Sequence, residues 1–174
     1  MRNTKKITLS SLLVALGVIF MSLGAVIEVV DLTACAVASL LVVFAYLEIG
    51  NPYPWLIWLC TSLISLLMFP GSFVWLNYLG VFGIYPILKA YIEKAPRFLW
   101  WILKLVYINI VIWAMIFLVE LIFSVPFFDT ELWIMRVALY LLINVAFIAY
   151  DLFITVMVRI YFGKIRQKFI RFLK

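Results

Sequence analysis

Residues 136–151 read RVALYLLINVAFIAYD, so an arginine and an aspartate enclose a run that is almost entirely apolar. The residues on both sides of this stretch continue the apolar run. The whole chain has 174 residues, of which 68% are hydrophobic and 13% are charged, and its mean hydropathy is +1.22. A soluble domain of this size cannot bury so much apolar surface. The stretch and its neighbours therefore predict helices that lie in lipid.

The apolar segments are long enough to cross a bilayer, whose core of about 30 Å needs roughly 20 residues of helix. We predict an all-α membrane protein with six transmembrane helices in a single domain over residues 1–174. The expected ranges are 7–29, 32–49, 54–70, 73–92, 98–125 and 132–160, of which the third is short for a spanning helix. Breaks such as EIGNPYP and FPGS, which are rich in turn-forming residues, separate the segments.

The charges predict how the chain is oriented. With six spans, basic residues fall on one side of the membrane: Arg2, Lys5, Lys6, Lys94, Arg97 and the lysines and arginines after residue 163. The purely acidic loops, with Glu28 and Asp31 and with Asp129 and Glu131, fall on the other side. The positive-inside rule then places both termini in the cytoplasm and the chain in the cell membrane, which we interpret as that of a bacterium. The net charge of +6 thus indicates topology and not nucleic-acid binding.

The last residues, 163–174, have a pattern of their own. On a helix, Ile165, Phe169, Phe172 and Leu173 share one face, and most of the basic residues lie opposite. This pattern predicts a basic amphipathic tail on the inner leaflet, which anchors the chain to membrane lipids or docks a cytosolic partner.

Polar residues of the sixth span fall on one helical face, which carries Arg136, Tyr140, Asn144 and Asp151. Contact with acyl chains is costly for such groups, so we expect this face to point into the helix bundle. Arg136 and Asp151 lie about 22 Å apart along a helix, too far to pair with each other. Glu120, in the fifth span, lies as far before the connecting turn as Arg136, in the sixth span, lies after it. A Glu120–Arg136 pair is expected, either as a structural bridge or in contact with a ligand, unless Arg136 extends to the outer interface.

The fourth span contains Gly83, which allows a bend, and Pro86, which removes a helical backbone bond, so we expect a kink there. Lys89 follows one turn later, at the expected depth of Asp151. Lys89–Asp151 is the second predicted intramembrane pair. Alternatively, Lys89 extends to the headgroups, or Glu48 or Glu93 neutralises it.

Small residues replace charges in the first two spans. Ser11 and Ala15 form a small-xxx-small step that Ser22 continues, and the second span carries Ala34, Ala38 and Ala45. Such faces let helices approach closely, within the monomer or against a partner.

The sequence lacks the residues that several classes of function require. The chain has no histidine, which argues against histidine-based catalysis and the usual zinc sites. It has no GxxxxGK[ST] loop for ATP. We therefore expect no enzyme, no cofactor and no metal, and no means within this chain of driving transport.

A six-span layout with both ends inside, a KKITL entry into the first helix and no ATP motif resembles the S component of an energy-coupling factor transporter. The resemblance implies a substrate-binding subunit for a vitamin-like small molecule. Its partners are then a transmembrane T component, which meets Ser11 and Ala15, and two cytosolic ATPases. It places the ligand in the outer half, near Asn77, Tyr78, Glu120, Arg136 and Tyr140, and the polar face of the sixth span adds Asn144.

The competing interpretation is a membrane scaffold of the bacterial envelope, similar to cell-shape proteins of the MreD class. The polar faces are then internal struts, and the aromatic residues at the outer ends form an interfacial belt. A ligand-binding protein should have an outer cavity lined by Glu120 and Arg136. A scaffold should have those two residues paired and its interior filled.

Overall fold

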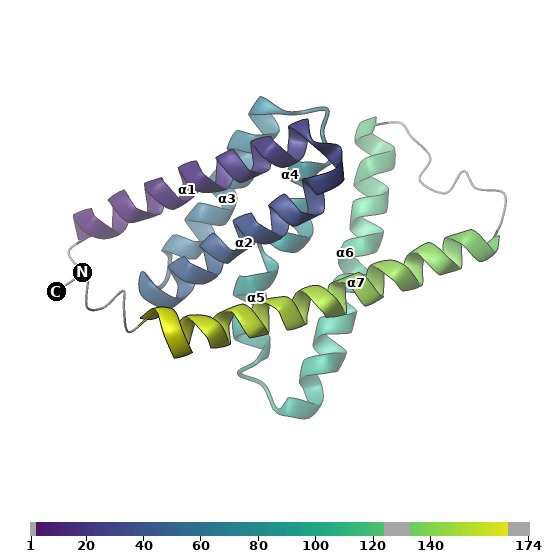
Figure 1. Cartoon of the computed structure of the whole chain (residues 1–174). Helices are drawn as coiled ribbons and strands as arrows, with labels where there is room; N and C mark the ends of the chain where they lie inside the picture. Colours follow the sequence, from purple (N-terminus) through teal and green to yellow (C-terminus); the bar gives the residue numbers. More distant parts are fainter. Residues whose placement is uncertain (1–2, 124–132, 167–174) are drawn as a thin grey trace. The chain divides into compact units, whose positions relative to one another are not determined.

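The computed structural model describes residues 3–123 and 133–166 and is helical, with no strand among these residues. The chain forms two compact units, Met1–Val125 and Pro126–Lys174. Unit 1 contains α1 to α6 and unit 2 contains α7 (Figure 1). The prediction of a single domain over 1–174 stays a prediction.

The first three helices of unit 1 pack on one another: α1 (Asn3–Val26), α2 (Asp31–Glu48) and α3 (Tyr53–Met68). A Cβ on Gly17 would lie 3.0 Å from the Thr61 side chain, and a Cβ on Gly24 would lie 2.9 Å from that of Ala34. These glycines therefore allow α1 to approach α3 and α2 closely. Pro54 lies in the first turn of α3, where a missing N–H costs nothing, and α3 ends before Pro70.

The small residues predicted on the second span are buried in this packing. Ala34, Ala38 and Ala45 all face the interior of unit 1, beside core residues such as Val42 and Met21. The alanine face of α2 thus packs within the chain. A short 3-10 turn, Glu28–Val30, connects α1 to α2.

The predicted fourth span is not one regular helix. It consists of α4 (Val74–Asn77), a π-helical turn labelled η2 (Tyr78–Phe82) and α5 (Tyr85–Ile92). The N–H of Gly83 donates to the Tyr78 carbonyl at 2.7 Å, five residues back. The kink expected at Gly83 and Pro86 falls within this irregular stretch, which begins at Tyr78, about two turns before Pro86.

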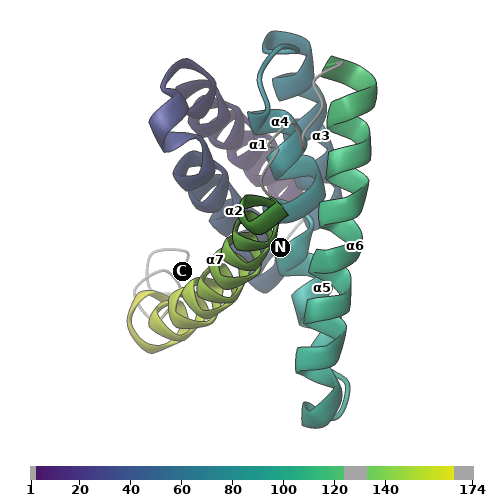
Figure 2. The ribbon, with the colours of Figure 1, turned by 90° about the vertical axis from the view of Figure 1, so that its right-hand side faces the viewer.

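The longest helix of unit 1 is α6 (Arg97–Phe123), which packs against α5 and η2 (Figure 2). Its buried side chains within the described residues are Lys104, Ile108, Ile112, Ile116 and Val119. Large apolar side chains on the rest of its surface are exposed, among them Ile110, Phe117 and Leu121. Moving one such side chain from water to an apolar medium is worth about 1.5–3 kcal/mol, so this surface suits lipid.

Unit 2 is built around α7 (Trp133–Ile160), which continues into a π-helical turn, Tyr161–Ile165. Because α7 is continuous, Tyr140, Asn144 and Asp151 lie on one helical face, as the sequence predicts. The Asn144 amide donates to the Tyr140 carbonyl at 3.0 Å, and the Thr155 hydroxyl donates to the Asp151 carbonyl at 2.9 Å. Most of the predicted basic tail lies outside the described residues.

Four helices in the described residues are long and apolar enough to cross a membrane: Asn3–Val26, Asp31–Glu48, Arg97–Ile122 and Val137–Lys164. The chain therefore has the build of a membrane protein. The predicted third span is the shorter apolar helix Tyr53–Met68, and the predicted fourth is the interrupted segment. Six spans with both ends in the cytoplasm stay a prediction.

Candidate functional site

A depression of about 550 Å³ lies at one end of unit 1, where α1 ends and α2 begins. On one side it is lined by Gly24 and Asp31, which belong to these two helices. The other side is the connection from α3 to α4, which contributes Phe69, Gly71, Ser72 and Phe73. We call this feature the α1–α2 depression. Its volume falls within the range of small-molecule sites, about 300–1,000 Å³.

The wall formed by the α3–α4 connection is held by hydrogen bonds. The Ser72 N–H donates to the Phe69 carbonyl at 3.1 Å, and the Ser72 hydroxyl accepts the Val74 N–H at 3.2 Å. The indole N–H of Trp75 donates to the Pro70 carbonyl at 3.3 Å. These hydrogen bonds give the connection a defined turn, which fixes the backbone positions of Phe69 and Phe73.

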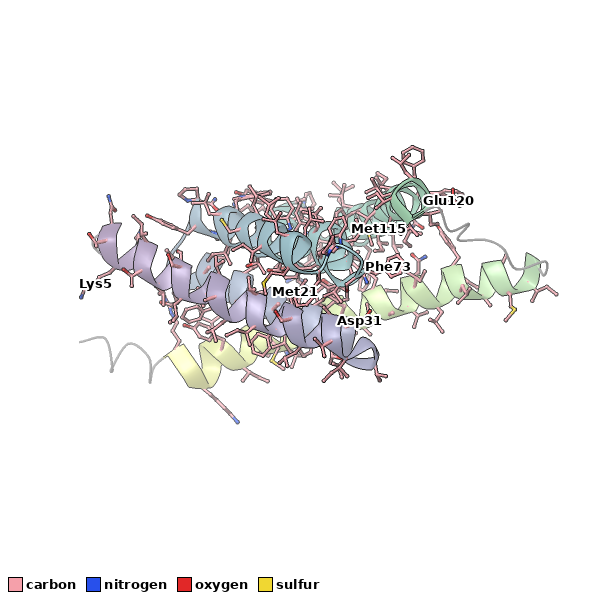
Figure 3. All side chains as sticks on the ribbon, turned by 90° about the horizontal axis from the view of Figure 1, so that it is seen from above. Lys5, Met21, Asp31, Phe73, Met115 and Glu120 are labelled. Carbon is pink, nitrogen blue, oxygen red and sulfur yellow. The ribbon has the colours of Figure 1, made fainter. Side chains whose placement is uncertain are left out.

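Asp31 is the first residue of α2, and its carboxylate accepts the N–H of Leu32. A negative charge at the start of a helix is stabilised by the helix dipole. Figure 3 labels Asp31 and Phe73, which both line the depression although they come from different parts of the chain. The depression thus combines a carboxylate with aromatic rings.

The π-helical turn η2 has an irregular backbone, and side chains from other helices donate hydrogen bonds to it. Because the N–H of Gly83 is committed to Tyr78, the Leu79 carbonyl lacks that helical donor. It accepts the indole N–H of Trp58, on α3, at 3.1 Å. The Tyr107 hydroxyl, on α6, donates to the Gly80 carbonyl at 2.7 Å. Irregular backbone is tolerated in a membrane protein where such partners satisfy it.

The tyrosines at this turn differ in what their hydroxyls do. Tyr78 is fully buried, and its hydroxyl has no hydrogen-bond partner among the described residues. The buried hydroxyls of Thr61 and Ser65 on α3 also have no hydrogen-bond partner among the described residues. In contrast, serines such as Ser22 and Ser62 donate to their own helix, at 2.8 Å in both cases.

This difference predicts opposite results for two matched substitutions. Tyr107→Phe should lower the free energy of unfolding by about 1 kcal/mol, because it leaves the Gly80 carbonyl without its donor. Tyr78→Phe should be neutral or slightly stabilising, because it removes a buried hydroxyl that bonds to nothing described. Both variants would be compared with the parent by SDS titration in mixed micelles. A larger loss for Tyr78→Phe than for Tyr107→Phe would contradict the assignment of the Gly80 contact.

A charged cluster lies at the other end of unit 1. The Glu93 carboxylate is 3.4 Å from the Lys89 ammonium and 3.0 Å from that of Lys104. Both lysines are buried, at 5% and 6% exposure. Glu93 was one of the alternatives considered for neutralising Lys89, and the structure shows that contact. The predicted Lys89–Asp151 pair would join the two units and stays a prediction.

The predicted ligand-binding residues do not line the α1–α2 depression. Asn77 is half-buried at the end of α4, and Tyr78 is inside unit 1. Glu120 is exposed on α6, beyond the aliphatic face that packs within unit 1 (Figure 3). Tyr140 and Asn144 belong to unit 2, and the Arg136 side chain lies outside the described residues. The Glu120–Arg136 pair therefore stays a prediction.

The residues predicted for a partner interface are on the surface of α1. Ser11 and Ala15 are exposed and Ser22 is half-buried. Their helix buries a different face, with Leu13, Gly17 and Met21. The Ser11 hydroxyl donates to the Ile7 carbonyl at 3.0 Å, so it does not project as a free donor. This small-residue face is thus shaped for the approach of another helix.

No family model, curated protein or solved structure matches this chain. Function therefore has to be inferred from the geometry and chemistry of the chain itself. The described residues contain no group of three or more cysteine, aspartate or glutamate side chains that could hold a metal ion. They offer two features to build on, the α1–α2 depression and the exposed small-residue face of α1.

Sequence reasoning passed over most of these contacts. The sequence places Phe69 and Phe73 at the adjoining ends of the expected third and fourth spans and Ser72 in the break between them, and nothing in their spacing indicates a cavity wall. Lys104 did carry a signal, because a lysine within an apolar run needs a partner. Thr61 and Ser65 carried another, since they share one face of an otherwise apolar helix.

Proposed function

We propose that this chain is the substrate-binding S component of an energy-coupling factor transporter. In this role it binds a vitamin-like small molecule at the outer side of the cell membrane and relies on separate subunits for energy. The observation that carries the proposal is the α1–α2 depression, whose size suits a small molecule. With the orientation that the charges predict, it opens to the outside.

The division of labour follows from what the sequence lacks. The chain has no P-loop, so ATP hydrolysis has to come from partners. The proposed partners are a transmembrane T component and two cytosolic ATPases. The exposed face with Ser11 and Ala15 is the proposed contact with the T component, because small residues allow two helices in lipid to approach closely. No chemistry is proposed for this chain itself.

The contact on α1 can be tested in the native membrane with a photo-cross-linking amino acid. Placed at Ala15, it should cross-link to an integral membrane protein that mass spectrometry identifies as a T component. Placed at Leu16, which is also exposed but points about 100° around the helix, it should give at least fivefold less of that product. Equal labelling from both positions, or labelling of lipid alone at Ala15, would count against the proposal.

A further inference from the structure

We infer that the α1–α2 depression is a binding site for organic cations, with Asp31 as the counter-charge. The inference rests on the proposed function, because it names the substrate class of the proposed ligand site. It is argued from the charge of the lining, from the helix start that Asp31 occupies, and from the rings beside it.

The electrostatic character of the depression is negative. Among the described residues that line it, Asp31 is the ionisable one. The sequence has no lysine or arginine from residue 7 to residue 88, so the four helices around the depression bring no basic side chain near it. A cleft of one sign with low-dielectric walls attracts ligands of the opposite charge.

The start of a helix ordinarily favours an anion, since N–H groups and the positive end of the helix dipole point outward there. Here that position is already occupied, because the Asp31 carboxylate accepts the N–H of Leu32. A ligand anion would meet this carboxylate at short range and be repelled. Asp31 lines the depression and so gives it a negative charge at this helix start.

The remaining lining distinguishes an organic cation from a metal ion. Phe69 and Phe73 line the depression, and aromatic rings attract cations that lie over their faces within about 6 Å. A Cβ at Gly71 would meet nothing within 4 Å, so a cation with carbon substituents has room beside it. A hard metal ion prefers six or more oxygen ligands, whereas the lining side chains offer one carboxylate and the Ser72 hydroxyl. The chemistry therefore favours an ammonium group or a charged heterocycle.

The test uses the purified full-length chain in lipid nanodiscs and two pairs of probes that match in shape and differ in charge. Choline is compared with neutral 3,3-dimethylbutan-1-ol, and phenyltrimethylammonium is compared with neutral tert-butylbenzene. Binding is followed by tryptophan fluorescence and by calorimetry. We expect saturable binding of at least one cation and binding at least tenfold weaker for its neutral counterpart.

Three variants assign the effect to Asp31. Asp31→Asn should weaken cation binding at least tenfold, and Asp31→Glu, which retains the charge, should restore most of it. Glu48→Gln removes a carboxylate from the opposite end of α2 and should leave the affinity unchanged. Size-exclusion profiles and melting temperatures confirm that each variant is folded, so that a loss of binding cannot be a loss of structure.

The outcomes separate this inference from the proposed function. If neutral probes bind as well as cations, or Asp31→Asn binds cations normally, the cation class is wrong even if a T component cross-links at Ala15. A Kd of ~1 mM corresponds to a binding free energy of about −4.1 kcal/mol. If no probe binds at concentrations up to 50-fold above that Kd, the inference is also overturned. If cations bind through Asp31 but no T component is found, the site stands and the transporter assignment fails.

Discussion

Gly83→Ala is expected to lower the free energy of unfolding by about 3 kcal/mol, the upper end of the usual cost of overpacking a core. A Cβ at this position would lie 2.5 Å from Cδ1 of Trp58 and 2.8 Å from Cε1 of Tyr78. Neither ring can move aside easily. Trp58 is held by its hydrogen bond to the Leu79 carbonyl, and Tyr78 is fully buried. The backbone of Gly83 is ordinary, with φ of −79°, so the expected cost is steric.

Gly80→Ala is the matched control, since Gly80 lies in the π-helical turn that ends directly before Gly83. Its added Cβ would meet the sulfur of Met115 at 3.0 Å, and a methionine side chain is flexible enough to move. We expect a loss of less than about 1 kcal/mol for this variant, measured like that of Gly83→Ala by SDS titration in mixed micelles. Equal stability of the two variants would show that the interior around Trp58 and Tyr78 is looser than described.

Glu93→Gln is expected to lower the free energy of unfolding by about 2 kcal/mol, because it removes the carboxylate that two buried ammonium groups share. Breaking a fully buried ion pair costs about 3–5 kcal/mol. The Glu93 side chain is 35% exposed, so solvent reduces the expected loss. The size is unchanged by the substitution, and the effect therefore reports charge and hydrogen bonding.

A double-mutant cycle with Lys104→Met isolates the contact. If Glu93 acts through Lys104, the double variant should be more stable than the sum of the two single losses predicts, by at least about 1 kcal/mol. Each variant is measured by the same SDS titration. Strictly additive losses would mean that the 3.0 Å contact contributes nothing to stability, and that Glu93 acts mainly through Lys89.

Helices and their approximate ends could be predicted from the sequence because lipid imposes a simple rule on composition. All six expected segments contain helix, and the breaks at residues 49–52, 69–73 and 93–96 contain the glycine, proline or charged residues that indicated them. The interruption before Pro86 was also predictable, because proline has no N–H to donate. Its extension back to Tyr78 was not, since it depends on Trp58 and Tyr107, which come from distant parts of the chain.

The candidate site was harder to predict for the same reason. Asp31 is recognisable in the sequence as an outer acidic residue, but Phe69 and Phe73, which line the depression with it, follow it by 38 and 42 residues. Glu120, the residue singled out in the fifth span, did not specify which side of α6 packs within unit 1. That side carries Ile108, Ile112 and Ile116, because branched aliphatic residues fill a helix interface without unsatisfied polar groups.

The two ends of unit 1 have different tasks in the proposed function. At the α1–α2 end, glycines and a hydrogen-bonded turn leave a depression with one carboxylate. At the other end, Glu93 binds Lys89 and Lys104 and so fixes the start of α6 to α5. Between them, the interrupted helix is braced by side chains from α3 and α6. A rigid unit with one open end is suited to holding a small molecule for delivery by partners.

Affinity purification of the tagged full-length chain from its own membrane in a mild detergent tests the central claim most directly. Mass spectrometry then identifies both the proteins and the small molecules that are retained. The proposed function predicts a T component, two ATPases and a small organic molecule that is released on denaturation. Recovery of envelope or cell-shape proteins, with no ATPase and no small molecule, would contradict it and favour the scaffold.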